Sequence, residues 1–322
     1  MVFLRSYWWV FLLMVIVIIA AIIFIPSDYQ KYNTSANKEG RFEWEMPDIT
    51  KLSSTEAELV GYGKELVANT AYYLGPKGKI ASISNGMNCQ NCHLQAGTKF
   101  LGNNYTAVNS TYPRFRARSG MVENIHKRIN DCLERSLNGQ QLDSSSLEMQ
   151  AISAYIKWIG SSVPKKVIPV GAGIADLPFL DRATDTTNGK AIFFQKCSRC
   201  HGTNGEGQLN IAGTGYIYPP LWGKHSYNVS AGLFRISRFA GFVKHNMPQD
   251  ASIHMADTLN NEEAWDVAAF VNSQPRPQKK FPQDWPDISK KPVDHPFGPY
   301  TNNFTESQHK YGPFPPMKKS GS

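Results

Sequence analysis

A continuous apolar run from Tyr7 to Ile25 opens the chain, and Arg5 is the only charged residue before it. A helix needs about 20 apolar residues to cross a bilayer, whereas a cleaved signal peptide has an apolar region of about 7 to 15 residues. We therefore predict a single uncleaved transmembrane anchor over residues 1–26, in preference to a buried core helix. The stretch that follows, residues 27–50, is polar with few apolar repeats and predicts a tether.

Beyond the tether, apolar residues recur at helical spacing in two similar pairs of segments. In the first pair, "TEAELVGYGKELVANTAYYLG" begins at Thr55 and leads towards "CQNCH", and "SSSLEMQAISAYIKWIG" ends at Gly160. In the second pair, "TTNGKAIFFQK" runs into "CSRCH", and "NNEEAWDVAAFVNS" carries Asn260 and Glu263 at the spacing of a helix-capping box. The order of helix, cysteine motif, loop and closing helix therefore occurs twice.

Four of the five cysteines lie in two CxxCH motifs. This motif attaches a c-type haem: both thiols form thioethers with the haem, and the adjacent histidine binds the iron. The residues predicted to attach the haems are Cys89, Cys92 and His93 in the first motif, and Cys197, Cys200 and His201 in the second. The alternatives are a disulfide in each pair, or a zinc ribbon, whose CxxC pairs would lie about 15 to 20 residues apart. Because these motifs are much further apart, we predict two covalently bound c-type haems.

These patterns predict an all-α fold, with two small class I-like cytochrome c domains in tandem after the transmembrane helix. The first domain is predicted over residues 51–163, a linker rich in Pro and Gly over 164–185, and the second domain over 186–274. Residues 275–322 contain ten of the twenty prolines and many aromatic side chains. We expect this extended tail to pack on both domains.

The second domain offers a methionine as the sixth ligand of its iron. In "FVKHNMPQD", Met247 follows His201 by 46 residues and precedes a proline, as in small methionine-ligated cytochromes. A thioether ligand raises the haem potential and suits electron transfer. Lys244, His245 and Met255 are the nearby alternatives.

The fifth cysteine, Cys132, occupies the corresponding distal position of the first domain, 39 residues after His93. The segment "SGMVENIHKRINDCLERSLNG" predicts a helix with one apolar stripe, formed by Ile125, Ile129, Leu133 and Leu137. Arg128, Cys132 and Ser136 recur every four residues and form a second row. A free cysteine is often simply buried, but one between a cation and a hydroxyl at the distal position of a haem favours a functional thiolate.

A thiolate ligand lowers the potential of the iron and keeps the sulfur deprotonated. Such a site suits sulfur chemistry better than a peroxidase, because a peroxidase needs an open iron face. Arginines bind small oxyanions, and the formal charge of +8 favours an anionic substrate or an acidic partner. Five arginines precede or lie on the predicted helix of Cys132: Arg114, Arg116, Arg118, Arg128 and Arg135. The alternative interpretation is that they form a solvated basic face.

Several segments resemble the dihaem thiosulfate dehydrogenases, over most of the chain after about residue 55. They are "GMNCQNCHLQAGT", "RARSGMVENIHKRINDCLERSLNG", "HNMP", and the tail "KPVDHPFGPY" with "QHKYGPF". The resemblance implies that two thiosulfates are oxidised to tetrathionate, or that the reaction runs in reverse. It places His93 and Cys132 on the catalytic haem, and His201 and Met247 on the haem from which electrons leave.

The same resemblance implies that Arg118, Arg128 and Ser136 line the thiosulfate pocket, with Cys132 as the reacting sulfur. Some members carry a lysine directly before the distal methionine, where this chain has Asn246. We expect a single-pass protein of the bacterial inner membrane with its catalytic domains in the periplasm, where it meets no nucleic acid. Its electrons would pass to a cytochrome c or to a membrane-bound redox complex. The alternative function is a non-catalytic, anchored dihaem subunit that feeds a terminal oxidase.

Overall fold

The computed structural model of this protein describes residues 41–249 and 258–319. The predicted transmembrane anchor, residues 1–26, and residues 27–40 of the predicted tether lie outside the described residues. Within the described ranges, no helix combines the length and the apolar character that crossing a membrane requires.

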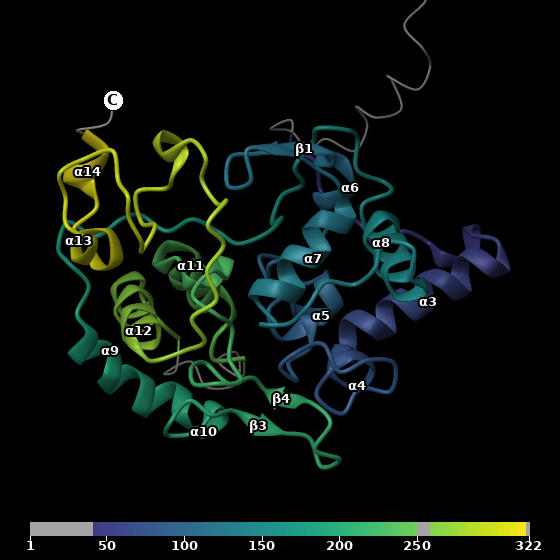
Figure 1. Cartoon of the computed structure of the whole chain (residues 1–322), viewed down its shortest axis with the longest axis horizontal. Coiled ribbons are helices and arrows are strands. Elements are labelled where there is room, and N and C mark those ends of the chain that lie inside the picture. Colours follow the sequence, from purple (N-terminus) through teal and green to yellow (C-terminus); the bar gives the residue numbers. More distant parts are fainter. Residues whose placement is uncertain (1–40, 250–257, 320–322) are drawn as a thin grey trace, which may run out of the picture. The chain divides into compact units, whose positions relative to one another are not determined.

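The chain divides into two compact units, Met1–Glu43 and Trp44–Ser322, and both CxxCH motifs belong to the second unit (Figure 1). The first half of this unit contains the elements η1 (Ile49–Lys51), α3 (Ser54–Ala68), α4 (Thr70–Leu74), η2 (Cys89–Asn91), α5 (Leu94–Gly97), α6 (Val108–Thr111), β1 (Arg114–Arg116), β2 (Met121–Glu123), α7 (Ile125–Arg135) and α8 (Leu147–Ile159). Helix α3 packs against α8. Gly63 permits this close approach, because a Cβ at that position would lie 2.0 Å from the carbonyl oxygen of Ala151.

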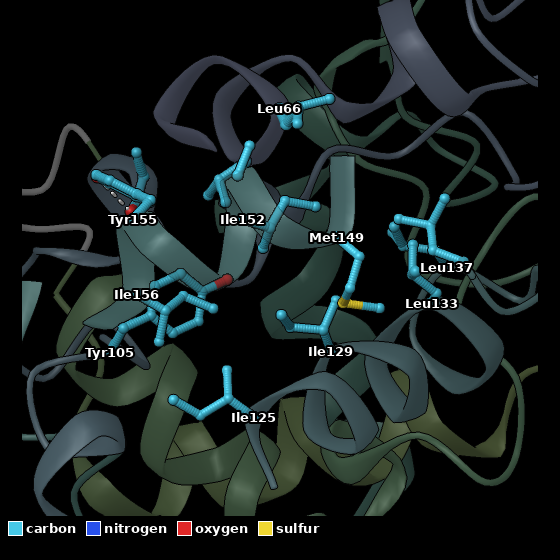
Figure 2. Packing of buried hydrophobic residues seen from close by; sticks show 14 of the residues in the cluster. Leu66, Tyr105, Ile125, Ile129, Leu133, Leu137, Met149, Ile152, Tyr155 and Ile156 are labelled. Carbon is cyan, nitrogen blue, oxygen red and sulfur yellow. Dashed lines mark hydrogen bonds between the residues drawn. The ribbon is translucent and has the colours of Figure 1, made fainter. Parts of the chain in front are cut away.

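The apolar stripe predicted on the cysteine-bearing helix is buried. Its four residues are at most 7% exposed, and they are Ile125, Ile129, Leu133 and Leu137. Figure 2 shows them in one cluster with Met149, Ile152 and Ile156 of α8. Burying an aliphatic side chain of this size contributes about 1.5–3 kcal/mol. The stripe therefore fixes the rotation of α7, and with it the direction of the neighbouring row that carries Cys132.

The second half of the unit repeats the helix pairing of the first. Its elements are α9 (Thr186–Ile192), a π-helical turn η3 (Phe193–Cys197), α10 (Ser198–His201), β3 (Gln208–Leu209), β4 (Tyr216–Tyr218), η4 (Gly232–Phe234), α11 (Ile236–Asn246) and α12 (Asn261–Ser273). The predicted capping box of Asn260 and Glu263 is present at the start of α12. Helix α9 packs on α12, where a Cβ at Gly189 would lie 1.9 Å from the carbonyl oxygen of Asp266.

The described residues are mostly helical, but the prediction of an all-α fold omitted two short antiparallel hairpins, β1–β2 and β3–β4. The second strand of the first hairpin, β2, occupies residues that we had predicted as the start of the cysteine-bearing helix. Its turn ends at Gly120, which has φ of +67° and donates its N–H to the carbonyl of Arg116 over 2.9 Å. Helix α7 starts only at Ile125, because the side chain of Asn124 caps it by accepting the N–H of Lys127.

The proline-rich tail contacts both halves of the unit. It contains η6 (Ile288–Lys290), α13 (Glu306–Tyr311) and α14 (Pro315–Lys319). Asp284 accepts two hydrogen bonds from Arg135 of α7, at 2.6 and 2.8 Å. Further along, Thr184 donates its N–H to the carbonyl of Tyr311 over 2.8 Å, next to α9. The tail therefore connects the cysteine-bearing helix with the second half.

Candidate functional site

The histidines of the two CxxCH motifs share one local geometry. His201 donates its Nδ1 proton to the carbonyl of Pro219 over 2.9 Å, and the Nδ1 of His93 bonds in the same way to the carbonyl of Asn103. Burial lowers the pKa of His93 to about 4 and also lowers the pKa of His201. Both imidazoles are therefore neutral, with Nε2 left as the lone-pair nitrogen, which is the form that binds a metal. The donor sets fit two c-type haems.

The cysteines before these histidines are arranged for covalent attachment. In the first motif, His93 donates its N–H to the carbonyl of Cys89 over 2.9 Å, so that one tight turn carries the cysteines and the histidine. The side-chain oxygen of Thr70 receives the N–H of Cys89 over 3.0 Å and holds the start of the motif against α4. All five cysteines are free of disulfides. The disulfide alternative for the CxxC pairs therefore receives no support.

Cys132 lies close to the first attachment motif. Burial raises the pKa of Cys92 to about 12, and the nearby charges of Cys132 and then Cys89 add to this shift. The ring of Tyr105 packs against the imidazole of His93, and the two ring centroids are 4.5 Å apart. The fold therefore brings the fifth cysteine and the first motif together, although they are far apart in sequence.

Arg128 is the cation that interacts most directly with Cys132. The pKa of Arg128 is raised above its usual range, chiefly because the negative charge of Cys132 stabilises the guanidinium, while burial opposes the shift. Both side chains project from α7, four residues apart, as the predicted row requires. An arginine in this position stabilises a thiolate and also presents N–H groups to an oxyanion.

Arg118 and Ser136 border the same region from different elements. Arg118 lies in the turn between β1 and β2, and burial, followed by the charge of Arg135, lowers its pKa to about 10. The charge of Arg128 also acts on Arg118, so the two guanidinium groups are close to one another. Ser136 is the C-cap of α7, and its N–H bonds to the carbonyl of Cys132 over 2.9 Å. Arg128 therefore lies beside Cys132 and Arg118 lies near Arg128, with Ser136 at the end of the helix that carries Cys132.

Arg135 has a different role from the arginines near Cys132. It is 4% exposed, and besides its two bonds to Asp284 it lies over the ring of Phe281 at 3.8 Å. A solvated basic face therefore does not describe this residue. Arg135 fastens the tail to α7.

Sequence reasoning missed Tyr112 as a member of this region. Its hydroxyl is buried without a hydrogen-bond partner within the described residues. Burial raises the pKa of Tyr112, and the charges of Arg128 and Cys132 also act on it. An unpartnered hydroxyl beside a thiolate and a cation is positioned to donate a hydrogen bond to a bound anion. No periodicity points to it, because it follows α6 in a loop.

A cavity of about 740 Å³ borders the second motif. Met247 at the end of α11 lines it together with His201 and both cysteines of the motif, whereas Lys244 and His245 do not. The amine of Lys244 instead donates to the carbonyl of Leu259, and His245 is exposed. Met255 lies outside the described residues. The geometry favours Met247, and its role as the iron ligand stays a prediction.

The same cavity also reaches the first motif. Cys92 and Leu94 are among its lining residues, as are Cys197 and Cys200 of the second motif. Asn91, inside the first motif, donates to the carbonyl of Tyr216 in β4 over 3.4 Å. The two attachment motifs therefore border one common space.

Comparison with known proteins agrees with this arrangement. The SoxA/TsdA cytochrome c domain matches residues 79–164, and the cytochrome c family matches residues 186–275. The thiosulfate dehydrogenase of Allochromatium vinosum is 36% identical over 241 residues, covering 72% of this chain and 87% of that protein. The thiosulfate dehydrogenase of Psychrobacter arcticus is 38% identical over 245 residues, covering 75% and 71%.

A solved structure is similar to this chain as well. It is that of the thiosulfate dehydrogenase TsdBA from Marichromatium purpuratum in its as-isolated form, with a TM-score of 0.68 and 28% identity. The match covers 84% of this chain and 54% of that one, so this chain spans about half the length of that protein. From the two attachment motifs, the two matching domains and these relatives, it follows that the chain is a member of the thiosulfate dehydrogenase family and carries two covalently bound c-type haems.

Proposed function

We propose that this protein oxidises two thiosulfate ions to tetrathionate in the bacterial periplasm. The observation that carries this proposal is the pairing of Cys132 with Arg128 beside the first attachment motif. An electron-transfer site needs neither a free thiolate nor an arginine next to it. A sulfur nucleophile that must meet a small oxyanion needs both.

The overall reaction balances as two thiosulfate dianions giving one tetrathionate dianion and two electrons. The haems supply one-electron acceptors, one electron for each iron, and we propose that the electrons leave from the second haem, held by His201 and Met247. Cys132 and His93 would hold the first iron. A reverse reaction, the reduction of tetrathionate, uses the same groups.

We propose that the reaction takes place in two steps at the sulfur of Cys132. In the first step, the thiolate of Cys132 bonds to the outer sulfur of one thiosulfate, and two electrons are released. In the second step, the outer sulfur of another thiosulfate attacks that bound sulfur. Tetrathionate then leaves, and the thiolate of Cys132 is regenerated. No proton is consumed in either step, so the site needs cations and hydrogen-bond donors rather than a general base.

Arg128 and Arg118 supply the positive charge that this chemistry requires. Thiosulfate is a dianion, and it approaches a thiolate that is itself negative. The guanidinium of Arg128 beside Cys132, and that of Arg118 next to Arg128, offset this repulsion and orient the sulfonate group. Ser136 and Tyr112 offer hydroxyl donors at the same site.

We also propose that residues 1–26 anchor the enzyme in the inner membrane, with its catalytic domains in the periplasm. The support for this is the length of the apolar run and the extracytoplasmic attachment of c-type haems. An anchored enzyme is held near membrane-bound redox complexes, so its electron acceptor would be such a complex or a cytochrome c.

The test is low-temperature electron paramagnetic resonance of the oxidised, detergent-purified protein, with and without thiosulfate. Optical absorbance of the same sample reports haem reduction. We expect a low-spin, thiolate-type signal that changes as thiosulfate reduces the haems. Two low-spin haems without a thiolate signal and without reduction by thiosulfate would instead indicate the electron-transfer subunit.

A further inference from the structure

A second cavity, of about 490 Å³, lies under the proline-rich tail and borders the candidate site at Arg118. The tail supplies Lys280, Trp285 and Lys291 to its wall, and Ser230, whose hydroxyl donates to the carbonyl of Lys279 over 2.7 Å, also lines it. No spacing or periodicity in the sequence links these tail residues to Cys132. Only the fold brings them beside Arg118.

The wall of this cavity is positively charged. Arg118, Lys280 and Lys291 contact no carboxylate within the part of the chain that the structure describes. The acidic wall residue Asp284 is already neutralised by Arg135. The remaining cation of the wall, Arg235, is likewise paired, with the buried carboxylate of Asp294.

His295 adds no charge to this wall and responds to the charges around it. Its Nε2 accepts the indole N–H of Trp285 over 3.0 Å, and its Nδ1 bonds to the carbonyl of Phe297. Its pKa is lowered to about 4, first by burial and then, against the effect of that carbonyl, by the positive charges of Lys291 and Arg118. The charge of Asp284 also acts on Arg118, but the wall carries four cations and one carboxylate, and this excess of positive charge suits an anion.

Arg118 connects the cavity with the reacting cysteine. Trp285 donates its N–H to the carbonyl of Arg118 over 2.6 Å, and the guanidinium of Arg118 lies 5.8 Å from the centroid of the indole ring. The charge of Arg128, the neighbour of Cys132, also acts on Arg118. Arg118 is therefore held by the tail in the wall of the cavity, and its charge interacts with that of Arg128, the neighbour of Cys132.

We propose that this cavity is the binding site of the second thiosulfate. Before tetrathionate is released, the cavity holds the sulfonate that came from this second thiosulfate. This inference rests on the proposed function. A thiosulfate dianion must approach the adduct on Cys132, whose sulfonate carries one negative charge, and a wall that carries Lys280, Lys291 and Arg118 offsets their repulsion. Attack on the bound sulfur then forms the central S–S bond of tetrathionate, and the thiolate of Cys132 leaves.

The experiment compares Lys280→Glu with Lys290→Glu in the full-length enzyme. Both lysines are exposed and lie in the tail, and the same substitution gives both variants the same net charge. Only Lys280 lines the cavity, so Lys290→Glu is the matched control. Rapid mixing with thiosulfate measures the first step as haem reduction. Steady-state production of tetrathionate measures both steps, and intact mass spectrometry measures the adduct on Cys132.

We expect Lys280→Glu to lower the steady-state kcat/KM by about tenfold and to accumulate the Cys132 adduct, while the rapid reduction stays at the rate of the wild type. Lys290→Glu should stay within about twofold of the wild type in all three measurements. Lys291→Gln should behave like Lys280→Glu. Because the amine of Lys291 is hydrogen-bonded to backbone carbonyls of the tail, the melting temperature of this variant shows whether the tail stays folded.

The possible results separate the two proposals. If the wild type makes tetrathionate but Lys280→Glu behaves like Lys290→Glu, the second site is wrong and the proposed function stands. If rapid reduction slows as much as turnover, the cavity guides the first thiosulfate, and the second site is again wrong. If the wild type makes no tetrathionate at all, the proposed function itself fails.

Discussion

The two haem-attachment regions of this protein are alike on the histidine side and different on the other. In both, the Nδ1 of the histidine bonds to a backbone carbonyl, which leaves Nε2 as the nitrogen that would hold a haem iron. On the distal side, the first region has Cys132 next to Arg128, with Tyr112 nearby. The second has Met247 in a cavity with Phe239, Phe242 and Val243.

The two domains share a common framework and differ in one segment. The attachment motif and the packed helix pair are held constant, as the matching glycines of α3 and α9 show. Only the segment that reaches the distal side changes: a charged row on α7 in one domain, and the end of the apolar helix α11 in the other. In the proposed function, this difference in polarity separates the domain that reacts with a substrate from the domain that transfers electrons.

The largest expected effect comes from removing the thiolate that distinguishes the first region. Cys132→Ala should lower thiosulfate oxidation by about 10³-fold or more, because it removes the reacting sulfur. Haem content, measured by the pyridine haemochrome assay, should stay at two per chain, since Cys89, Cys92, Cys197 and Cys200 are unchanged. Activity near that of the wild type would mean that Cys132 is not the reacting sulfur.

The next effect comes from removing the cation of the first region. Arg128→Gln should lower kcat/KM for thiosulfate by about 10²- to 10³-fold, because a buried anion loses its charged donor. Arg114→Gln is the matched control, since Arg114 is exposed on the neighbouring strand β1, and it should stay within about twofold. Equal losses in both variants would indicate general attraction of the substrate by the basic surface.

A smaller effect on turnover, but a clear effect on potential, is expected in the second region. Met247→Ala should lower the midpoint potential of one haem, because a thioether ligand favours the reduced iron and axial ligands tune potentials over about 0.8 V. Spectropotentiometric titration measures this shift. Lys244→Gln should leave both potentials unchanged. A shift in that variant, with none in Met247→Ala, would make the lysine the ligand.

The smallest expected effect is on the stability of the second domain in acid. Burial alone would raise the pKa of Asp266 in α12, but hydrogen bonds from Arg182, Asp185 and Asn188 hold it below the ordinary value. A depressed pKa in the folded state means that this carboxylate stabilises the fold above about pH 4, and that the stability is lost as the pH falls through the folded pKa.

Asp266→Asn should therefore cost about 1–3 kcal/mol of unfolding free energy at pH 7, and should weaken the loss of stability below about pH 4. Urea unfolding at both pH values, followed through the absorbance of the second haem, measures this. Asp181→Asn is the control, because Asp181 is exposed next to Arg182. An equal cost in both variants would show that the network around Asp266 does not stabilise the domain.

Much of the fold could be predicted, because its signals are local. Apolar periodicity located α3, α8 and α12, and the capping box at Asn260 gave the start of α12 correctly. The start of α7 was predicted too early. The segment "RFRAR" alternates charged and apolar residues, as a strand does, but "SGMVE" does not, and the hairpin also depends on the positive φ of Gly120, which no periodicity shows.

The sequence by itself determined the chemistry that this protein carries: two attachment motifs, a row that aligns Arg128 with Cys132, and a methionine at the end of α11. These follow from spacing, because covalent attachment and helix geometry act over a few residues. Tertiary structure alone decided which arginine meets which partner. Arg135 binds Asp284 across 149 residues, whereas Arg118 forms no ion pair with a carboxylate of the described residues and lines a cavity. That outcome depends on how the tail folds back over α7, and long-range pairing of this kind has no periodicity that a sequence can display.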